Sequence, residues 1–232
     1  MTADPRRELP NWHPAPFPTG TAIHGHFCRL EKLHRDHAPS LFAAHAHDLE
    51  GRNWAYLPYG PFTEADHANW IEKISHEADP LFYAVIDPAT GAAIGQASLM
   101  SIVPAHGVIE VGHIHFSPLL QRTPASTEAL VQLISWAMDN GYRRMEWKCD
   151  AANAASRRAA QRLGLSFEGV FRNHRVVKNR NRDTAWYAAT IEDWPALEAA
   201  YATWLDPKNF DAQGQQRQSL SRLTRPLLHA TG

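Results

Sequence analysis

Apolar residues recur along this chain with two spacings, and the change between them predicts both strands and helices. Short apolar runs bounded by turn residues predict strands over 25–33, 81–87, 93–103, 108–116, 144–149, 167–177 and 183–191. Helical spacing predicts helices over 34–49, from Thr63 through Ile74, from Thr123 to about Asn140, over 153–163 and over 192–205. Helices alternate with strands only in the second half of this order. The pattern therefore favours an α/β fold with a mixed sheet over a doubly wound parallel sheet.

Residues that begin and end elements sharpen three of these predictions. Thr123 is typical of an N-cap, and Pro124 follows it at the first helical position. Asn153 caps the next helix, and Gly164 ends it. Gly112 interrupts an apolar strand, which predicts a β-bulge or the close approach of another backbone.

The two ends of the chain differ from its body. Residues 1–20 contain five prolines and little apolar periodicity, so we expect an extended arm. Trp12 and Phe17 would be poor choices for a free tail, which favours an arm lying on the body. The body is expected to span 21–205, and the polar tail 206–232 could include a short helix.

Composition narrows the class of protein. The 23 Lys and Arg residues nearly balance 24 Asp and Glu, so no global basic field exists to hold nucleic acid or an acidic membrane. No run of about 18 apolar residues predicts a transmembrane helix. The only cysteines, Cys28 and Cys149, cannot form a disulfide framework or a cysteine-based zinc site. We expect a soluble cytoplasmic protein without nucleic-acid or membrane partners.

Two strand–helix units carry candidate chemistry. In the first, the strand 108–116 is followed by a helix that opens within Gln121–Thr127. A helix start with free backbone N–H groups binds anions, and Arg122 beside it suits a pyrophosphate. The second unit runs from Asn153-x-x-Ser156 through a helix into a further strand.

These units resemble motifs of the GNAT acetyltransferase superfamily and, within it, of the RimJ/RimL-type protein N-terminal acetyltransferases. Gln121-x-x-Pro124-x-Ser126 stands where the family has Gln/Arg-x-x-Gly-x-Gly/Ala, and Thr127-Glu128-Ala129-Leu130 matches the usual continuation in this branch. The stretch from Asn153-Ala-Ala-Ser156 to Leu165, with Phe167-Glu168-Gly169 and the arginine-rich turn after it, matches the last third. The resemblance covers roughly residues 20–205.

The resemblance implies a mostly antiparallel twisted sheet flanked by helices. It implies transfer of acetyl from acetyl-CoA to a primary amine, on a protein N-terminus or a small molecule, by direct attack in a ternary complex. It also implies a set of cofactor-binding residues, namely His115, Phe116, Gln121, Arg122, Thr123, Ala125, Ser126, Thr127, Asn153 and Arg158.

Two departures from the family pattern keep a second function open. Pro124 replaces a glycine and removes one N–H donor, so we expect a phosphate contact to be lost or shifted. The family's usual tyrosine position is Ala160 here. A non-catalytic module that binds or senses acyl-CoA is therefore the alternative. A homodimer could form if the tail from Phe210 to Leu228 exchanged between subunits.

Two residues are candidates for the catalytic steps. Glu110 is an acid in an apolar strand, where burial would raise its pKa and suit it to act as general base. Alternatively it faces solvent or pairs with an arginine. The resemblance implies that Ser156 donates a proton to the CoA thiol, whereas a serine in a first helical turn can also assist the cap.

Histidines and aromatic residues complete the candidate set. His113 and His115 alternate with Glu110 and point to the opposite face unless a bulge at Gly112 resets the register. They could bind a metal ion as a pair, but no third ligand is evident, so we expect no bound metal. A His-rich metal hydrolase would need three converging histidines.

An aromatic segment precedes the second helix. As in related proteins, Trp54, Tyr56, Tyr59 and Phe62 are expected to wall a substrate pocket, with packing under the loop as the alternative. Lys178, Arg180 and Arg182 are expected at a solvent-exposed hairpin tip, the alternative being a role in binding an acidic substrate or RNA.

Overall fold

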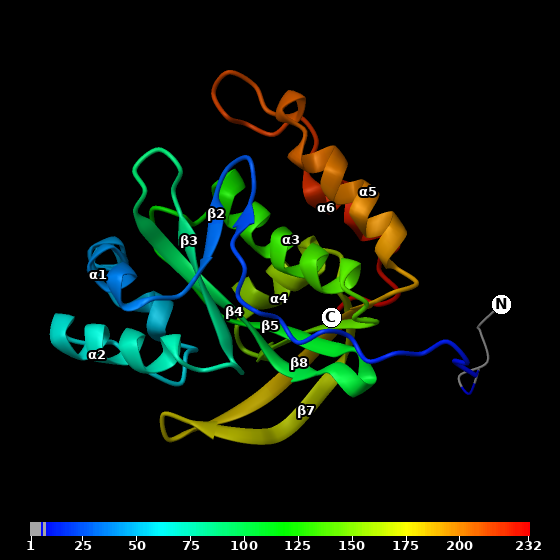
Figure 1. Ribbon diagram of the computed structural model, residues 1–232, viewed down its shortest axis with the longest axis horizontal. Helices are drawn as coiled ribbons and strands as arrows, with labels where there is room; N and C mark the ends of the chain where they lie inside the picture. Colours follow the sequence, from blue (N-terminus) through cyan, green and yellow to red (C-terminus); the bar gives the residue numbers. More distant parts are fainter. Residues whose placement is uncertain (1–5, 7) are drawn as a thin grey trace.

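A twisted sheet organises the computed structural model, which describes residues 6 and 8–232. Within that part of the chain, eight strands pair in the order β1-β2-β3-β4-β5-β6-β8-β7 (Figure 1). Their bounds are β1 Ile23–His24, β2 Arg29–Lys32, β3 Leu81–Ile86, β4 Ala93–Val103, β5 Val108–Phe116, β6 Arg144–Asp150, β7 Ser166–Val177 and β8 Arg180–Thr190. Neighbouring strands are antiparallel except for the parallel pair β5 and β6. The expected mixed, mostly antiparallel α/β fold is confirmed.

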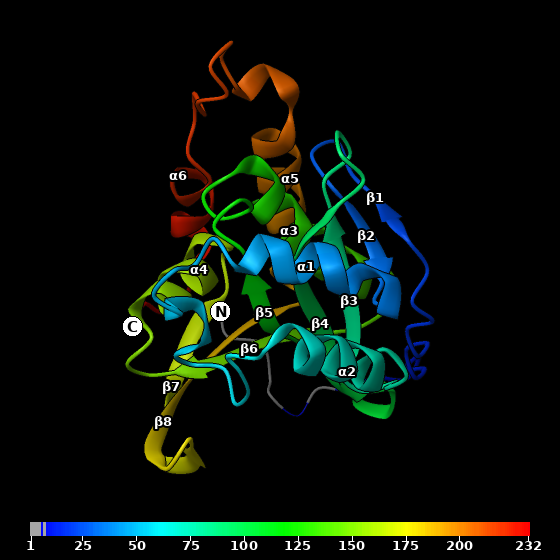
Figure 2. The ribbon, with the colours of Figure 1, turned by 90° about the vertical axis from the view of Figure 1, so that its left-hand side faces the viewer.

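Helices cover both faces of this sheet (Figures 1 and 2). They are α1 Ala38–His45, α2 Glu64–Ser75, α3 Pro124–Asp139, α4 Ala154–Arg162, α5 Trp194–Leu205 and α6 Leu220–Thr224. Helices α1 and α2 lie on one face, and α3 and α4 lie on the other. Helices α5 and α6 pack against the outer side of α3 and α4.

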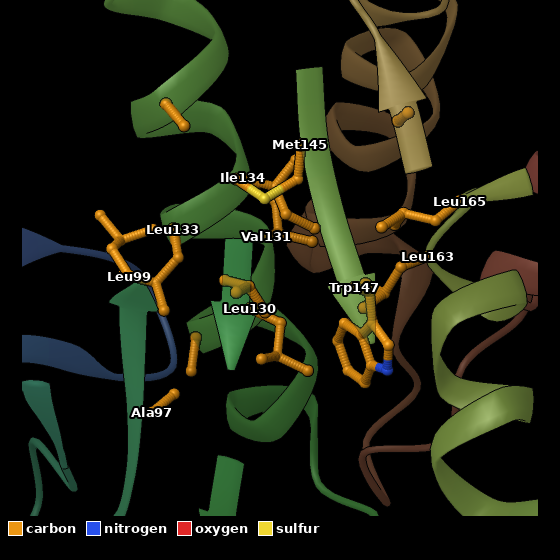
Figure 3. Close-up of a cluster of buried hydrophobic side chains, with 14 of the residues drawn as sticks. Ala97, Leu99, Leu130, Val131, Leu133, Ile134, Met145, Trp147, Leu163 and Leu165 are labelled. Atoms are coloured by element: carbon orange, nitrogen blue, oxygen red, sulfur yellow. The ribbon is translucent and has the colours of Figure 1, made fainter. Parts of the chain in front are cut away.

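Two apolar clusters fill the spaces between the sheet and its helices. The larger cluster lies under α3 and α4 and includes Leu99, Leu133, Ile134 and Trp147 (Figure 3). The smaller cluster lies under α1 and α2. Because β3 contributes alternate residues to both clusters, every one of its side chains is buried. Burial on two faces explains why this strand is an unbroken apolar run in the sequence.

The prediction of one continuous strand over 25–33 is wrong, because only Arg29–Lys32 of that range forms a strand. The chain forms a hairpin of β1 and β2 instead, since the carboxylate of Glu128 in α3 accepts the backbone N–H groups of His26, Phe27 and Cys28 at 2.8, 2.7 and 2.8 Å. The predicted helix 34–49 is also shorter, because a 3-10 turn over Arg35–His37 precedes α1.

The segments at both ends lie against the body. The Trp12 indole N–H donates to Ala105 O at 3.1 Å, and the Tyr142 hydroxyl donates to Pro16 O at 2.9 Å, whereas Phe17 is 44% exposed. Residues 1–5 and 7 of the predicted arm lie outside the described residues. In the tail, Leu220 is fully buried and Ala230 O accepts the N–H of Phe167. No helix in the described chain is long and apolar enough to cross a membrane.

Strands β5 and β6 diverge at the centre of the sheet. Their pairing joins Val108–Glu110 to Arg144–Glu146 and does not continue beyond Glu110. On its other side, β5 has the bulge that Gly112 predicted: two β5 residues face Ala97, and His113 has a φ of 48°. The remaining length of β5 therefore borders a gap in the sheet.

Candidate active site

The gap between β5 and β6 is part of a cleft of about 1310 Å³. Both strands line it, together with the first turns of α3 and α4. The loop before α2, the β7–β8 hairpin and the C-terminal tail complete its rim. The cleft thus reaches both faces of the sheet.

The first turn of α3 offers free backbone N–H donors beside the cleft. The Thr123 side chain accepts the N–H of Ser126 at 3.2 Å, the Thr123 N–H donates to Leu120 O, and Pro124 has no N–H. The N–H groups of Ala125 and Thr127 are left without an acceptor among the described residues. The predicted Thr123 cap is confirmed. Pro124 leaves this helix start with one N–H donor fewer than a glycine would provide.

Arginines surround this helix start. Arg122 and Arg158 are exposed at the cleft. Arg162 donates to the hydroxyl of Thr127 at 2.9 Å, so that threonine's side chain is already engaged. Arg162 and Arg225 also line the cleft, although neither was in the predicted cofactor set. Arg162 shares a helix face with Arg158, whereas the sequence of the tail contains no signal for Arg225.

Two other predicted cofactor residues have side chains engaged elsewhere. The Gln121 amide donates to Asn53 Oδ1 and to Phe116 O, both at 2.8 Å, and so ties the aromatic loop to the end of β5. The His115 ring is 1% exposed and stacks on His45 at a centroid distance of 3.6 Å. It lies in the layer under α1 because the bulge turns it away from the cofactor side.

Glu110 lies where the pairing of β5 with β6 ends, and the residue is 5% exposed. Its Oε2 accepts the Ser101 hydroxyl at 2.9 Å and lies 2.8 Å from the Lys148 ammonium. Its Oε1 has no protein donor in the described chain, and a Cβ placed on Gly112 would lie 3.7 Å from it. The charge partner is thus a lysine, not the arginine that the sequence left open.

Lys148 balances the charge of this buried carboxylate. It also binds Glu146 at 2.8 Å and lies 4.4 Å from the centre of the Trp186 ring. Burial by itself lowers the pKa of Lys148, but the two carboxylates outweigh it and hold that pKa above its ordinary value. Lys148 therefore stays positively charged near neutral pH.

Ser156 presents its hydroxyl to the cleft from the first turn of α4. The cap of this helix is Asn153, whose Oδ1 accepts the Ser156 N–H at 3.0 Å. The Trp147 indole N–H donates to Ser156 Oγ at 3.0 Å. Because that bond occupies a lone pair of the oxygen, the hydroxyl hydrogen of Ser156 can donate, and the neighbouring Cys149 thiol is one acceptor within its reach.

Of the four aromatic residues expected to wall a pocket, the cleft is lined by Tyr56 alone. Its hydroxyl donates to Ala152 O at 3.2 Å. Trp54, Tyr59 and Phe62 pack beneath the loop, where the Trp54 ring lies 3.9 Å from that of His115. These three rings fill the space above buried histidines, as expected if they pack under the loop instead of walling a substrate pocket.

The β7–β8 hairpin contacts this loop. The Lys178 ammonium donates to Trp54 O at 2.9 Å, so the hairpin tip is tied across the cleft instead of standing alone in solvent. The Tyr59 hydroxyl lies 3.1 Å from Nδ1 of His113.

A layer of buried histidines lies beside the cleft. The ring nitrogens of His45, His67 and His115 and the amide of Gln96 have no partner in the described structure. Burial lowers the pKa of these histidines to about 3, 4 and 2 respectively, which keeps them neutral. Among the described residues no group of three or more His, Cys, Asp or Glu side chains is arranged to hold a metal ion.

Comparison with known proteins identifies the fold and family. The profile of the acetyltransferase (GNAT) domain matches residues 28–166. A GCN5-related N-acetyltransferase from Brucella melitensis is 46% identical over 94% of this chain and 100% of its own, with a TM-score of 0.90. A probable acetyltransferase (GNAT family) from Chromobacterium violaceum is 38% identical over 84% of this chain and 99% of its own, with a TM-score of 0.77.

A more distant likeness concerns the fold alone. RimL, a ribosomal alpha-N-protein acetyltransferase, is 18% identical over 77% of this chain and 94% of its own, with a TM-score of 0.62. No curated protein matches the chain significantly. The domain match and the high identity to a GCN5-related structure, together with the sheet that opens between β5 and β6, show that the chain belongs to the GNAT family of acetyltransferases.

Proposed function

We propose that this protein is an acetyl-CoA-dependent N-acetyltransferase that acts on a primary amine in a ternary complex. The observation that carries the proposal is Glu110, a buried carboxylate with one oxygen held by Ser101 and Lys148 and the other free beside Gly112. It lies at the point where the sheet opens.

The cleft fits acetyl-CoA in shape and charge. Arg122, Arg158 and Arg225 line it, and the free N–H of Ala125 at the start of α3 adds a backbone donor for a phosphate. The gap between β5 and β6 offers unpaired backbone groups on a strand edge, to which the pantetheine arm of the cofactor could hydrogen-bond. Acetyl-CoA supplies an acetyl group activated as a thioester.

Glu110 is positioned to accept the proton of the attacking amine on Oε1. Lys148 and Ser101 hold its other oxygen, which fixes the orientation of the carboxylate. An α-amine has an ordinary pKa near 8 and a lysine side chain about 10.4, so a base is needed more for the second than for the first. This residue is the proposed general base.

The remaining groups act on charge that develops at the acetyl group and the sulfur. The edge of β5 beyond Glu110 is not paired with β6, so its N–H groups are available as donors to an oxyanion. The Ser156 hydroxyl, oriented by Trp147, is the proposed proton donor to the leaving thiolate.

Two measurements on the purified protein test the proposal. Calorimetry with acetyl-CoA should give a saturable heat. Release of CoA thiol, with mass spectrometry of the product, should then identify an acetylated amine among N-terminal peptides, free amino acids and polyamines. Binding of acetyl-CoA without transfer to any of these amines would reduce the protein to an acyl-CoA binding module.

A further inference from the structure

The cleft has a second half, on the sheet face opposite α3 and α4. Glu110 and Lys148 meet on this face, and the Lys148 ammonium lies over the ring of Trp186. Side chains alternate along β8, so Arg182 shares the face of Trp186 and lines the cleft. Arg182 therefore stands on the side where the amine would enter, away from the helix starts that suit the phosphates.

Arg182 is a half-buried cation without a partner in the described structure. Its Nε is buried and donates to no acceptor, and no carboxylate of the described chain forms an ion pair with it. Two other half-buried arginines do have acceptors: Arg144 binds Glu168 through two bonds of 2.8 and 2.6 Å, and Arg157 donates to the Tyr187 hydroxyl. A buried guanidinium N–H without an acceptor is costly, so an acceptor from outside the chain would be favoured there.

The surrounding charges point to an anion as that acceptor. Glu110 and Glu146 are both engaged by Lys148, so they do not neutralise Arg182. Arg175 also lines this part of the cleft. Burial, and to a smaller extent the nearby charge of Arg182, lowers the pKa of His113 to about 4. This histidine of the β5 bulge is therefore neutral and adds no charge to the site. The indole N–H of Trp186 is a second buried donor without an acceptor on the same strand face.

We propose that Arg182 binds a carboxylate of the amine substrate, so that the acceptor is an amino acid or a peptide with an acidic residue at its amino end. A planar carboxylate matches the guanidinium fork and accepts its donors. The same positive surroundings disfavour the protonated amine and so help to present it in its neutral, reactive form. This inference rests on the proposed function and names its substrate class.

Matched acceptors test the proposal by kcat/KM. One pair is an amino acid and its amide, and the other is a peptide amide with aspartate or asparagine as its first residue. The member with the carboxylate should be preferred about 10- to 100-fold. The pair that shows the preference tells whether the α-carboxylate or a side-chain carboxylate is bound.

Variants of two arginines assign the preference to one side chain. Arg182→Gln should abolish it, and Arg182→Lys should retain part of it. Arg180→Gln removes the same charge two residues away, on an exposed side chain that does not line the cleft, and should leave the preference unchanged. Equal kcat/KM for both members of each pair, or a preference that survives Arg182→Gln, would overturn the inference while leaving the acetyl transfer intact.

A binding experiment decides the inference even if no acceptor is turned over. The indole N–H resonance of Trp186, assigned with Trp186→Phe, is followed while N-acetylaspartate is added. A saturable shift is expected, absent with the neutral N-acetylasparagine amide and absent in Arg182→Gln. No shift in the parent protein would rule out a carboxylate site at Arg182, whereas a shift without any turnover would leave the site and remove the proposed reaction.

Discussion

Single residues of the cleft fall into two groups that the sequence did not separate. Gln121, Thr127 and His115 have side chains occupied by other parts of the chain. Glu110 keeps one carboxylate oxygen free beside the gap, and the Ser156 hydroxyl lines the same cleft. Residue type and strand position selected Glu110, and the family resemblance selected the other four, but most of their partners come from other elements. Only the folded chain shows which atoms remain for a ligand.

Ser156→Ala tests the proposed proton donor. We expect a lower kcat than in the parent, but a smaller loss than for Glu110→Gln, because a thiol with an ordinary pKa near 8.5 can leave as thiolate near neutral pH. The variant also leaves the Trp147 indole N–H without its acceptor, which costs about 1–3 kcal/mol of unfolding free energy if no water replaces it. Steady-state rates and urea unfolding measure the two effects.

Trp147→Phe is the matched control, since it removes the same hydrogen bond and keeps the Ser156 hydroxyl. Its kcat should fall less than that of Ser156→Ala. Equal rates for the parent and Ser156→Ala would show that the hydroxyl has no part in the reaction.

Elements were predictable where their signals are local. The caps Thr123 and Asn153 stand directly before α3 and α4, and both form as expected. The β1–β2 hairpin was missed because Glu128, about 100 residues away in sequence, holds its turn. The packing of the aromatic loop was hidden for a similar reason: the Trp54 ring lies on His45 and His115, which come from separate elements.

Asn153 links the start of α4 to the cleft and separates capping from binding. Asn153→Ala should lower the unfolding free energy by about 0.5–2 kcal/mol through loss of the cap. Asn153→Asp keeps an oxygen for the Ser156 N–H but loses the amide donor. If that amide binds the pantetheine arm, this variant should unfold like the parent and bind acetyl-CoA more weakly in calorimetry. Unchanged affinity would restrict Asn153 to capping.

The histidine layer under α1 and α2 should make stability depend on pH. The folded-state pKa values of His45, His67 and His115 lie below the ordinary 6.5, so only the unfolded chain takes up protons as pH falls from 6.5 toward 4. The unfolding free energy should therefore decrease as the pH is lowered, by about 1 kcal/mol per pH unit for each histidine. Urea unfolding at several pH values between about 7 and 5 measures this slope.

A variant that cannot take up the proton gives the comparison. His45→Phe keeps a ring against His115 and Trp54 and should flatten the slope. Removing the exposed His106 should not change it. The same slope in the parent and His45→Phe would mean that His45 is not buried as a neutral group.

At the scale of the whole molecule, the single parallel pair in the sheet decides where chemistry can occur. Because β5 and β6 separate beyond Glu110, the helix starts on one face and the charged residues on the other open into one cleft. The C-terminal tail closes part of this cleft with Arg225 and Leu228 while packing on its own chain. The order of most elements along the chain and the two helix starts were readable from the sequence. The contribution of the tail was not, because its polar composition has no periodic pattern.

The central claim is that Glu110 accepts the proton of the amine in this cleft, and one comparison tests it most directly. The kcat of Glu110→Gln is measured at saturating acetyl-CoA beside that of Glu146→Gln, which removes the other carboxylate bound to Lys148 but does not line the cleft. We predict a loss of about 10²- to 10⁴-fold for Glu110→Gln, a rate close to the parent for Glu146→Gln, and unchanged acetyl-CoA affinity in both. A kcat for Glu110→Gln within about twofold of the parent, which is far below the contribution of a positioned base, would contradict the account.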